Sequence, residues 1–159
     1  MTSASLSRLT IIAILTCATL ALAACGSAPK KHGLEVLITA SADVNPDLES
    51  RASPVILHIL ELTAIDEFNR ADYFSLTQDD ASALGVDVVN KTELILTPGS
   101  QKSLTLELDE KVAYLGFVAG YRDIDNSRWR ISEEIRPGKT DRVAVSLGRD
   151  QVSIVEIKD

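Results

Sequence analysis

Cysteine and histidine are scarce in this chain of 159 residues, which contains two of each. Cys17 and Cys25 both lie near the start, so the rest of the chain has no thiol for a disulfide or a cysteine metal site. Of the two histidines, His32 precedes the first expected strand and His58 lies inside an apolar one. A hydrolytic triad needs a histidine beside its nucleophile. The sequence therefore argues against an envelope hydrolase, and His58 is interpreted as a core histidine.

Basic and aromatic residues are also few. The 16 Lys and Arg stand against 23 Asp and Glu, which gives a net charge of −7 at pH 7. No basic stripe of the kind that binds nucleic acid is present, and the acidity opposes electrostatic adhesion to anionic lipid. Because aromatic residues make up only 4% of the chain, Tyr121 and Trp129 are interpreted as core residues. A platform for a sugar or another small ligand is the alternative.

Acidic residues cluster in two places without matching a metal-binding motif. Asp79, Asp80 and Asp87 do not have the spacing of a calcium loop, and acids at a helix start explain the first pair. The segment 123–127 lacks the glycine and the distal glutamate of such a loop. We therefore expect no metal, no cofactor and no catalytic centre, and interpret residues 123–127 as a turn.

The N-terminal segment has the pattern of a lipoprotein signal peptide. Arg8 is the only charged residue before Cys25, and the apolar run that follows it is too short for a comfortable membrane span. The run ends in Leu22-Ala23-Ala24-Cys25, which resembles a bacterial lipobox. In that motif the cysteine receives a diacylglyceryl group and becomes the first residue after cleavage. We expect residues 1–24 to be the signal peptide and Cys25 to be the lipid attachment site.

The residues after Cys25 predict how the domain is held. Residues 25–33 are small, polar or basic, and are expected to form a flexible tether. Position 26 is Gly rather than the Asp that commonly retains lipoproteins in the inner membrane. We therefore expect a protein anchored to the outer membrane by lipid, with its domain facing the periplasm.

Residues 34–159 have the size of one domain and mostly the pattern of short strands. Apolar residues alternate at Leu104, Leu106 and Leu108, which are expected to point inward, whereas the second strand is apolar on both faces. Short strands separated by turns are typical of a β-sandwich. The expected strands are 34–40, 55–62, 93–97, 103–108, 113–121, 128–132, 143–147 and 151–157.

One segment, about 63–85, has helical spacing instead. Thr63 is expected to cap a first helix with Asp66 as its capping-box partner, and Thr77 to cap a second helix over residues 78–84. A helical insertion there explains why the strand before it has no polar face. The helices are expected to cover Ile56, Leu60 and Leu62.

Several short motifs follow one another along the chain in a characteristic order. They are the lipobox at Cys25, Asn45-Pro46, Ser53-Pro54-Val55, Phe68 with Ala71-Asp72-Tyr73-Phe74, Asp79-Asp80-Ala81 with Leu84-Gly85, Glu93-Leu94 with Pro98-Gly99, Tyr114-Leu115-Gly116-Phe117-Val118-Ala119-Gly120-Tyr121-Arg122-Asp123 and Trp129-Arg130. In this order and spacing, they resemble the TssJ family, the outer-membrane lipoproteins of type VI secretion systems.

The resemblance implies a mainly β fold, a transthyretin-like two-sheet β-sandwich with a short helical insertion. It also implies a non-enzymatic role, in which the protein anchors a trans-envelope complex and binds the periplasmic C-terminal region of TssM. In the family, the loop between the first two strands takes part in that contact. Its counterpart here consists of Asn45, Pro46, Asp47, Leu48, Glu49, Ser50, Arg51, Ala52 and Ser53.

That loop is longer than a hairpin requires, because two residues suffice to join paired strands. Leu48 is its one large apolar residue and lies among Asp47, Glu49 and Arg51. An apolar centre with a charged rim is typical of a protein interface. The residues Ser50-Arg51-Ala52 stand where family loops often have Gly-Arg-Pro. A solvated connector is the alternative for the loop, and a small-ligand or glycan-binding envelope lipoprotein is the alternative for the protein.

Overall fold

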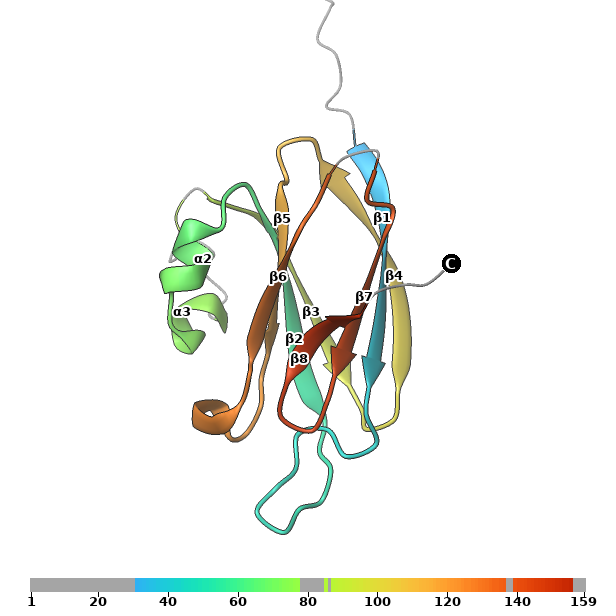
Figure 1. Ribbon diagram of the computed structural model, residues 1–159, viewed down its shortest axis with the longest axis vertical. Helices are drawn as coiled ribbons and strands as arrows, with labels where there is room; N and C mark the ends of the chain where they lie inside the picture. Colours follow the sequence, from blue (N-terminus) through green and yellow to red (C-terminus); the bar gives the residue numbers. More distant parts are fainter. Residues whose placement is uncertain (1–30, 78–84, 86, 137–138, 156–159) are drawn as a thin grey trace, which may run out of the picture.

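Two four-stranded sheets pack face to face in the computed structural model, which describes residues 31–77, 85, 87–136 and 139–155 (Figure 1). One sheet has the order β4-β1-β7-β8 and the other the order β3-β2-β5-β6. The predicted two-sheet β-sandwich is therefore confirmed. The strands are β1 (Lys31–Ala40), β2 (Val55–Leu62), β3 (Val88–Leu96), β4 (Gln101–Asp109), β5 (Tyr114–Ala119), β6 (Arg130–Glu134), β7 (Arg142–Leu147) and β8 (Val152–Val155).

Strand pairing decides which connections share an end of the sandwich. β1 is antiparallel to β4, with Lys31 opposite Asp109, and parallel to β7. β2 is antiparallel to both of its neighbours, β3 and β5. As a result, the β1–β2, β5–β6 and β7–β8 connections lie together at the end opposite the start of β1 (Figure 1).

The main core lies between the sheets. Leu34, Val36 and Ile38 of β1 are almost completely buried, as the alternation predicts, and they face Leu115 and Phe117 of β5 within one apolar cluster. Burying each such side chain contributes roughly 1.5–3 kcal/mol. The predicted inward face of β4 is confirmed as well, because Leu106 and Leu108 are buried and Leu104 packs against the same cluster.

A second, smaller apolar cluster lies under two short helices, α2 (Asp66–Arg70) and α3 (Tyr73–Thr77). Phe68 and Leu76 of these helices cover Leu60 and Leu62 of β2. Gly116 makes this packing possible, since a Cβ at that position would lie 2.6 Å from Cε2 of Phe68. The expected cover over β2 is thus confirmed, except at Ile56, which remains 40% exposed because it lies near the far end of the strand.

The predicted cap of the first helix is wrong. α2 begins at Asp66 with Ile65 at the N-cap and no side-chain cap. Thr63 does not cap it, because its backbone N–H donates to the carbonyl oxygen of Asp87 at 2.8 Å, which holds it at the end of the sheet. A helix that was not predicted separately, α3, lies at residues 73–77. The predicted helix over 78–84 lies outside the described residues and stays a prediction.

β1 and β3 begin several residues before their patterns predict. β1 begins at Lys31, so the last three residues of the expected tether, including His32, pair with β4. β3 begins at Val88 rather than at residue 93. His58 is buried in β2, with Nδ1 at 3.5 Å from a carboxylate oxygen of Glu93 on β3, which fits its interpretation as a core histidine.

Within the described parts of the chain, no helix is long and apolar enough to cross a membrane. Over the same residues, no group of three or more His, Cys, Asp or Glu side chains is placed to hold a metal ion. Asp79 and Asp80 lie outside these residues. Residues 124–126 form a single 3₁₀ turn, η3 (Ile124–Asn126), and the Asn126 amide donates to the Asp123 carboxylate at 2.9 Å, so the predicted turn is confirmed.

Candidate binding site

The β1–β2 connection, residues 41–54, extends beyond the ends of the strands as a long loop (Figure 1). All nine residues predicted from the sequence, Asn45 to Ser53, lie in it. Six of them line a pocket of about 1020 Å³ together with residues of the β5–β6 and β7–β8 connections. Ser50, Ala52 and Ser53 are not among the pocket residues, and Ser53 is buried. The lining consists of Asn45, Pro46, Asp47, Leu48, Glu49, Arg51, Tyr121, Arg122, Asp123, Ser127, Arg149 and Asp150.

Asn45 fixes the base of the loop to both neighbouring connections. Its Nδ2 donates to the carbonyl oxygen of Pro54 at 2.6 Å, and its Oδ1 accepts the backbone N–H of Arg122 at 2.7 Å. Its own backbone N–H donates to the carbonyl oxygen of Arg149 at 2.9 Å. The residue is only 4% exposed and has a φ of 49°, a conformation that Asn tolerates better than most residues. One residue therefore holds three connections together, two of them through its side chain and the third through its backbone.

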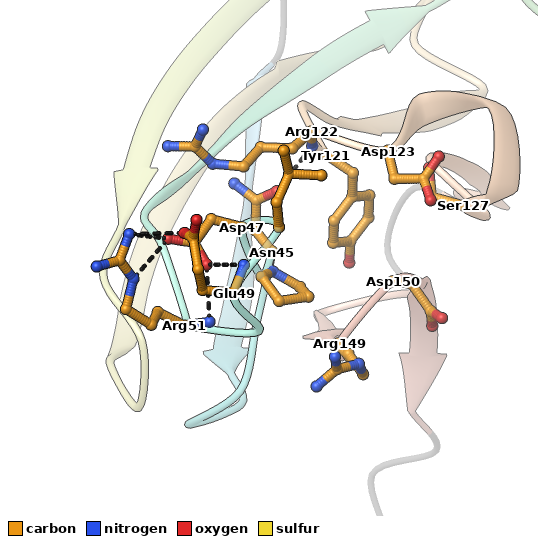
Figure 2. Close-up of a pocket in the computed structure, with 12 residues that line it drawn as sticks. Asn45, Asp47, Glu49, Arg51, Tyr121, Arg122, Asp123, Ser127, Arg149 and Asp150 are labelled. Carbon is orange, nitrogen blue, oxygen red and sulfur yellow. Dashed lines mark hydrogen bonds and ion pairs between the residues drawn. The ribbon is translucent and has the colours of Figure 1, made fainter.

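The Asp47 carboxylate organises the tip of the loop. Oδ1 accepts the backbone N–H groups of Glu49 at 3.0 Å and Arg51 at 2.9 Å. Oδ2 accepts Nε of Arg51 at 2.8 Å (Figure 2). The backbone hydrogen bond from Arg51 is the main reason that the pKa of Asp47 lies below its usual value, against the opposing effect of desolvation. The tip is thus a closed turn held by a charged acceptor.

The Arg51 side chain forms its ion pairs within the loop itself. Its Nη2 lies 2.8 Å from Oδ2 of Asp47 and 2.9 Å from Oε2 of Glu49. Single exposed ion pairs contribute little to stability, but here one guanidinium joins two carboxylates of the same turn. The residue pattern predicts that Arg51 contacts a partner. Its guanidinium N–H groups, however, already bind Asp47 and Glu49, so a partner would have to compete with these carboxylates.

Ser50 has a φ of 62°, in the left-handed region where glycine is favoured. The position at which family loops often have Gly thus carries a backbone that suits Gly. Here the conformation is held by the hydrogen bond from the Ser50 N–H to the carbonyl oxygen of Asp47 at 2.9 Å. The departure from the family pattern does not prevent the turn from closing.

Leu48 is the most exposed large apolar residue at the tip, with its full surface open to solvent. A leucine in that position gives nothing to the core, and its burial by a partner would contribute roughly 1.5–3 kcal/mol. The turn around it is held by at least four hydrogen bonds between Asp47 and residues 49–51. The loop therefore presents an apolar side chain on a preformed backbone.

The aromatic residues of the β5–β6 connection belong to the core. Tyr121 is 6% exposed and its hydroxyl donates to the carbonyl oxygen of Gly148 at 3.2 Å, while burial raises the pKa of that hydroxyl. Trp129 makes an edge contact with Tyr73 at 5.5 Å between ring centroids, and the Arg130 guanidinium lies 4.9 Å from the centre of its ring. Because its faces are occupied in this way, the alternative of a sugar platform has no support in the geometry.

Sequence reasoning did not identify Arg122, Asp123, Arg149 and Asp150 as neighbours of the loop. They lie far from the loop in the chain, and the hydrogen bond from Arg122 to Asn45 joins residues that are 77 positions apart. What brings these three connections to one end is the strand pairing: β7 runs parallel to β1, and β5 runs antiparallel to β2.

Comparisons with known proteins agree with the fold and identify the family. The family model described as "Type VI secretion lipoprotein, VasD, EvfM, TssJ, VC_A0113" matches residues 32–150. The lipoprotein TssJ1 from Pseudomonas aeruginosa is 34% identical, with a TM-score of 0.76 over 83% of this chain and 99% of that chain. Lip from Serratia marcescens, a membrane bound component of the type VI secretion system, is 26% identical, with a TM-score of 0.73 over 83% and 100%.

A third likeness shows the fold alone. A chain in the structure of the TssM C-terminal domain from EAEC is 20% identical, with a TM-score of 0.64 over 80% of this chain and 99% of that chain. No curated protein matches this chain.

Proposed function

Since this chain belongs to the type VI secretion lipoprotein family that includes TssJ, we propose that it anchors the membrane complex of that system at the outer membrane and binds the periplasmic C-terminal region of TssM. The family is one of structural lipoproteins rather than enzymes. The proposed contact is the β1–β2 loop, with Leu48 at its centre.

The proposed anchor is a lipid on Cys25, after removal of residues 1–24. Six residues, 25–30, separate it from the first described residue, and an extended chain of that length reaches about 20 Å. The domain would then face the periplasm at a short distance from the membrane. These segments lie outside the described residues, and the support comes from the sequence pattern and from the family.

The direction of β1 supports this arrangement. β1 starts at Lys31, at the end next to the tether, and runs ten residues toward the loop. A strand of that length spans roughly 33 Å. The loop is therefore carried at the end of the sandwich that is remote from the lipid, where a periplasmic partner is accessible (Figure 1).

The observation that carries the proposal is the preformed tip with an exposed leucine. A loop that is already ordered loses little conformational freedom on binding, so more of the contact energy appears as affinity. A solvated connector needs neither the hydrogen bonds of Asp47 nor an apolar side chain directed into solvent.

Calorimetric titration with the periplasmic C-terminal fragment of TssM tests this function. We expect Leu48→Asp to weaken binding at least tenfold, or about 1.4 kcal/mol, without lowering the melting temperature, because the side chain contributes nothing to the core. The matched control is Thr105→Asp, which adds the same charge on an exposed position of β4. Equal affinities for wild type and Leu48→Asp would exclude the loop tip from the interface.

A further inference from the structure

We infer that two connections, β1–β2 and β5–β6, contact the partner. In this arrangement, Arg122 of the β5–β6 connection pairs with a carboxylate of the partner beside Leu48. This inference rests on the proposed function and specifies the chemistry of the surface that the partner presents. It assigns the charged contact to Arg122, whereas the residue pattern of the first loop alone points to Arg51.

Arg51 is poorly suited to be the charged contact. Its guanidinium already lies within 2.9 Å of carboxylate oxygens of Asp47 and Glu49. Pairing with a partner would have to compete with both of these groups. Its side chain and backbone together close the turn that carries Leu48.

Arg122 differs from Arg51 in this respect. In the part of the chain that the structure describes, its side chain has no ion pair within 4.0 Å and no hydrogen bond. The pKa of Asp47 is lowered mainly by the backbone hydrogen bond from Arg51 and also by the charge of Arg122, but no ion pair within 4.0 Å joins Asp47 to Arg122. Asp47 already accepts two backbone N–H groups at Oδ1 and two guanidinium nitrogens of Arg51 at Oδ2, which fills the roughly four acceptor sites of a carboxylate.

The backbone of Arg122 is nevertheless held firmly against the loop. Its N–H donates to Oδ1 of Asn45 at 2.7 Å, and both Arg122 and Leu48 line the same pocket. Figure 2 shows the Arg122 side chain above Asp47, with Asp123 and Asp150 on the far side of Tyr121. Charges of both signs line the pocket, but Arg51 is paired with Asp47 and Glu49, and Arg149 lies 3.9 Å from a carboxylate oxygen of Asp43. Among the described pocket residues, Arg122 is thus the cation whose side chain has no ion pair within 4.0 Å.

These positions define the complementary surface. A segment of the partner that covers Leu48 with apolar side chains would bring its neighbouring residues over Arg122. A carboxylate there can form two parallel hydrogen bonds with the planar guanidinium, which fixes orientation as well as adding affinity. A cation in that position would be repelled by Arg122, so the arrangement also selects the register of the partner segment.

The test compares charge reversals in the full mature chain, purified in detergent and titrated with the TssM periplasmic fragment. Arg122→Glu should weaken binding at least tenfold, and Arg122→Lys less, because an ammonium group cannot make the bidentate contact. Arg128→Glu is the matched control: it makes the same charge change at an exposed residue of the same connection that does not line the pocket. Its affinity should stay near that of wild type.

Salt provides a second readout. The difference between wild type and Arg122→Glu should narrow as ionic strength rises from ~0.05 to ~0.5 M, because exposed charges are increasingly screened. The melting temperature should change little, since within the described residues the only hydrogen bond of Arg122 is made by its backbone and its charge acts on Asp47 without an ion pair.

The outcomes separate this inference from the proposed function. Loss of binding in Leu48→Asp with unchanged binding in Arg122→Glu would overturn the role of Arg122 and leave the loop as the contact. Equal losses in Arg122→Glu and Arg128→Glu would overturn it too, since a general charge effect would then suffice. No binding by the wild-type chain would overturn both proposals.

Discussion

Asn45→Ala is the substitution that most directly probes how the loop is held. Its side chain makes two hydrogen bonds, to the carbonyl oxygen of Pro54 and from the N–H of Arg122, and each is worth about 1 kcal/mol. The φ of 49° adds about 1 kcal/mol, because Ala tolerates the left-handed region less well than Asn. The expected loss is therefore about 3 kcal/mol, a large part of a total stability of roughly 5–15 kcal/mol.

Urea denaturation followed by circular dichroism measures this loss, and the melting temperature should fall by about 10 °C. Asn45→Asp should lose at least as much, because it keeps the acceptor for the Arg122 N–H but places a buried carboxylate oxygen against the carbonyl oxygen of Pro54. Asn126→Ala is the surface control, with an expected change within about 0.5 kcal/mol, since its one partner is exposed. A loss below about 1 kcal/mol in Asn45→Ala would refute the view that this residue holds the three connections together.

Three further outcomes follow from burial, backbone conformation and the lipid anchor. Leu106→Asp should unfold the domain or lower its stability by several kcal/mol in urea denaturation, because it buries an unpaired charge. Thr105→Asp, at an exposed position, should be tolerated. Similar behaviour of the two variants would disprove the register of β4. Ser50→Gly should leave the free energy of unfolding unchanged or raise it by up to about 1 kcal/mol, whereas Ser50→Val should lower it by about 1–2 kcal/mol, because a β-branched residue is strained at a φ of 62°. A Val variant more stable than the Gly variant would contradict this conformation of Ser50. Cys25→Ser should abolish fatty-acid labelling and outer-membrane sedimentation, and unchanged fractionation would rule out the lipid anchor.

Alternation of apolar residues predicts the sandwich well because each strand buries one face. Leu104, Leu106 and Leu108 point inward as expected, and the strand 55–62, which has apolar residues on both faces, is covered on both sides over most of its length. The strand ends are predicted less well. Lys31 to Gly33 carry no alternating pattern, and they join β1 only through pairing with the end of β4.

Local signals fail where a distant residue provides the partner. A capping box at Thr63 is a reasonable local pattern, but Asp87 lies beside Thr63 and binds its backbone instead. In the candidate site, the sequence identifies the loop and the exposed Leu48. The sequence does not show that Arg51 is bound to Asp47, because this depends on side-chain geometry. It also does not place Arg122 beside the loop, because Arg122 and Asn45 are 77 residues apart in the chain.

Site-specific crosslinking in the assembled envelope complex tests the central claim, that the β1–β2 loop contacts TssM, most directly. A photoreactive residue replaces Leu48 in the full chain in one strain and Lys111 in another. Lys111 is equally exposed, but lies in the β4–β5 turn at the tether end of the sandwich. The account predicts a crosslink to the periplasmic region of TssM from position 48 and none from position 111. A crosslink from position 111 with none from position 48 would contradict it.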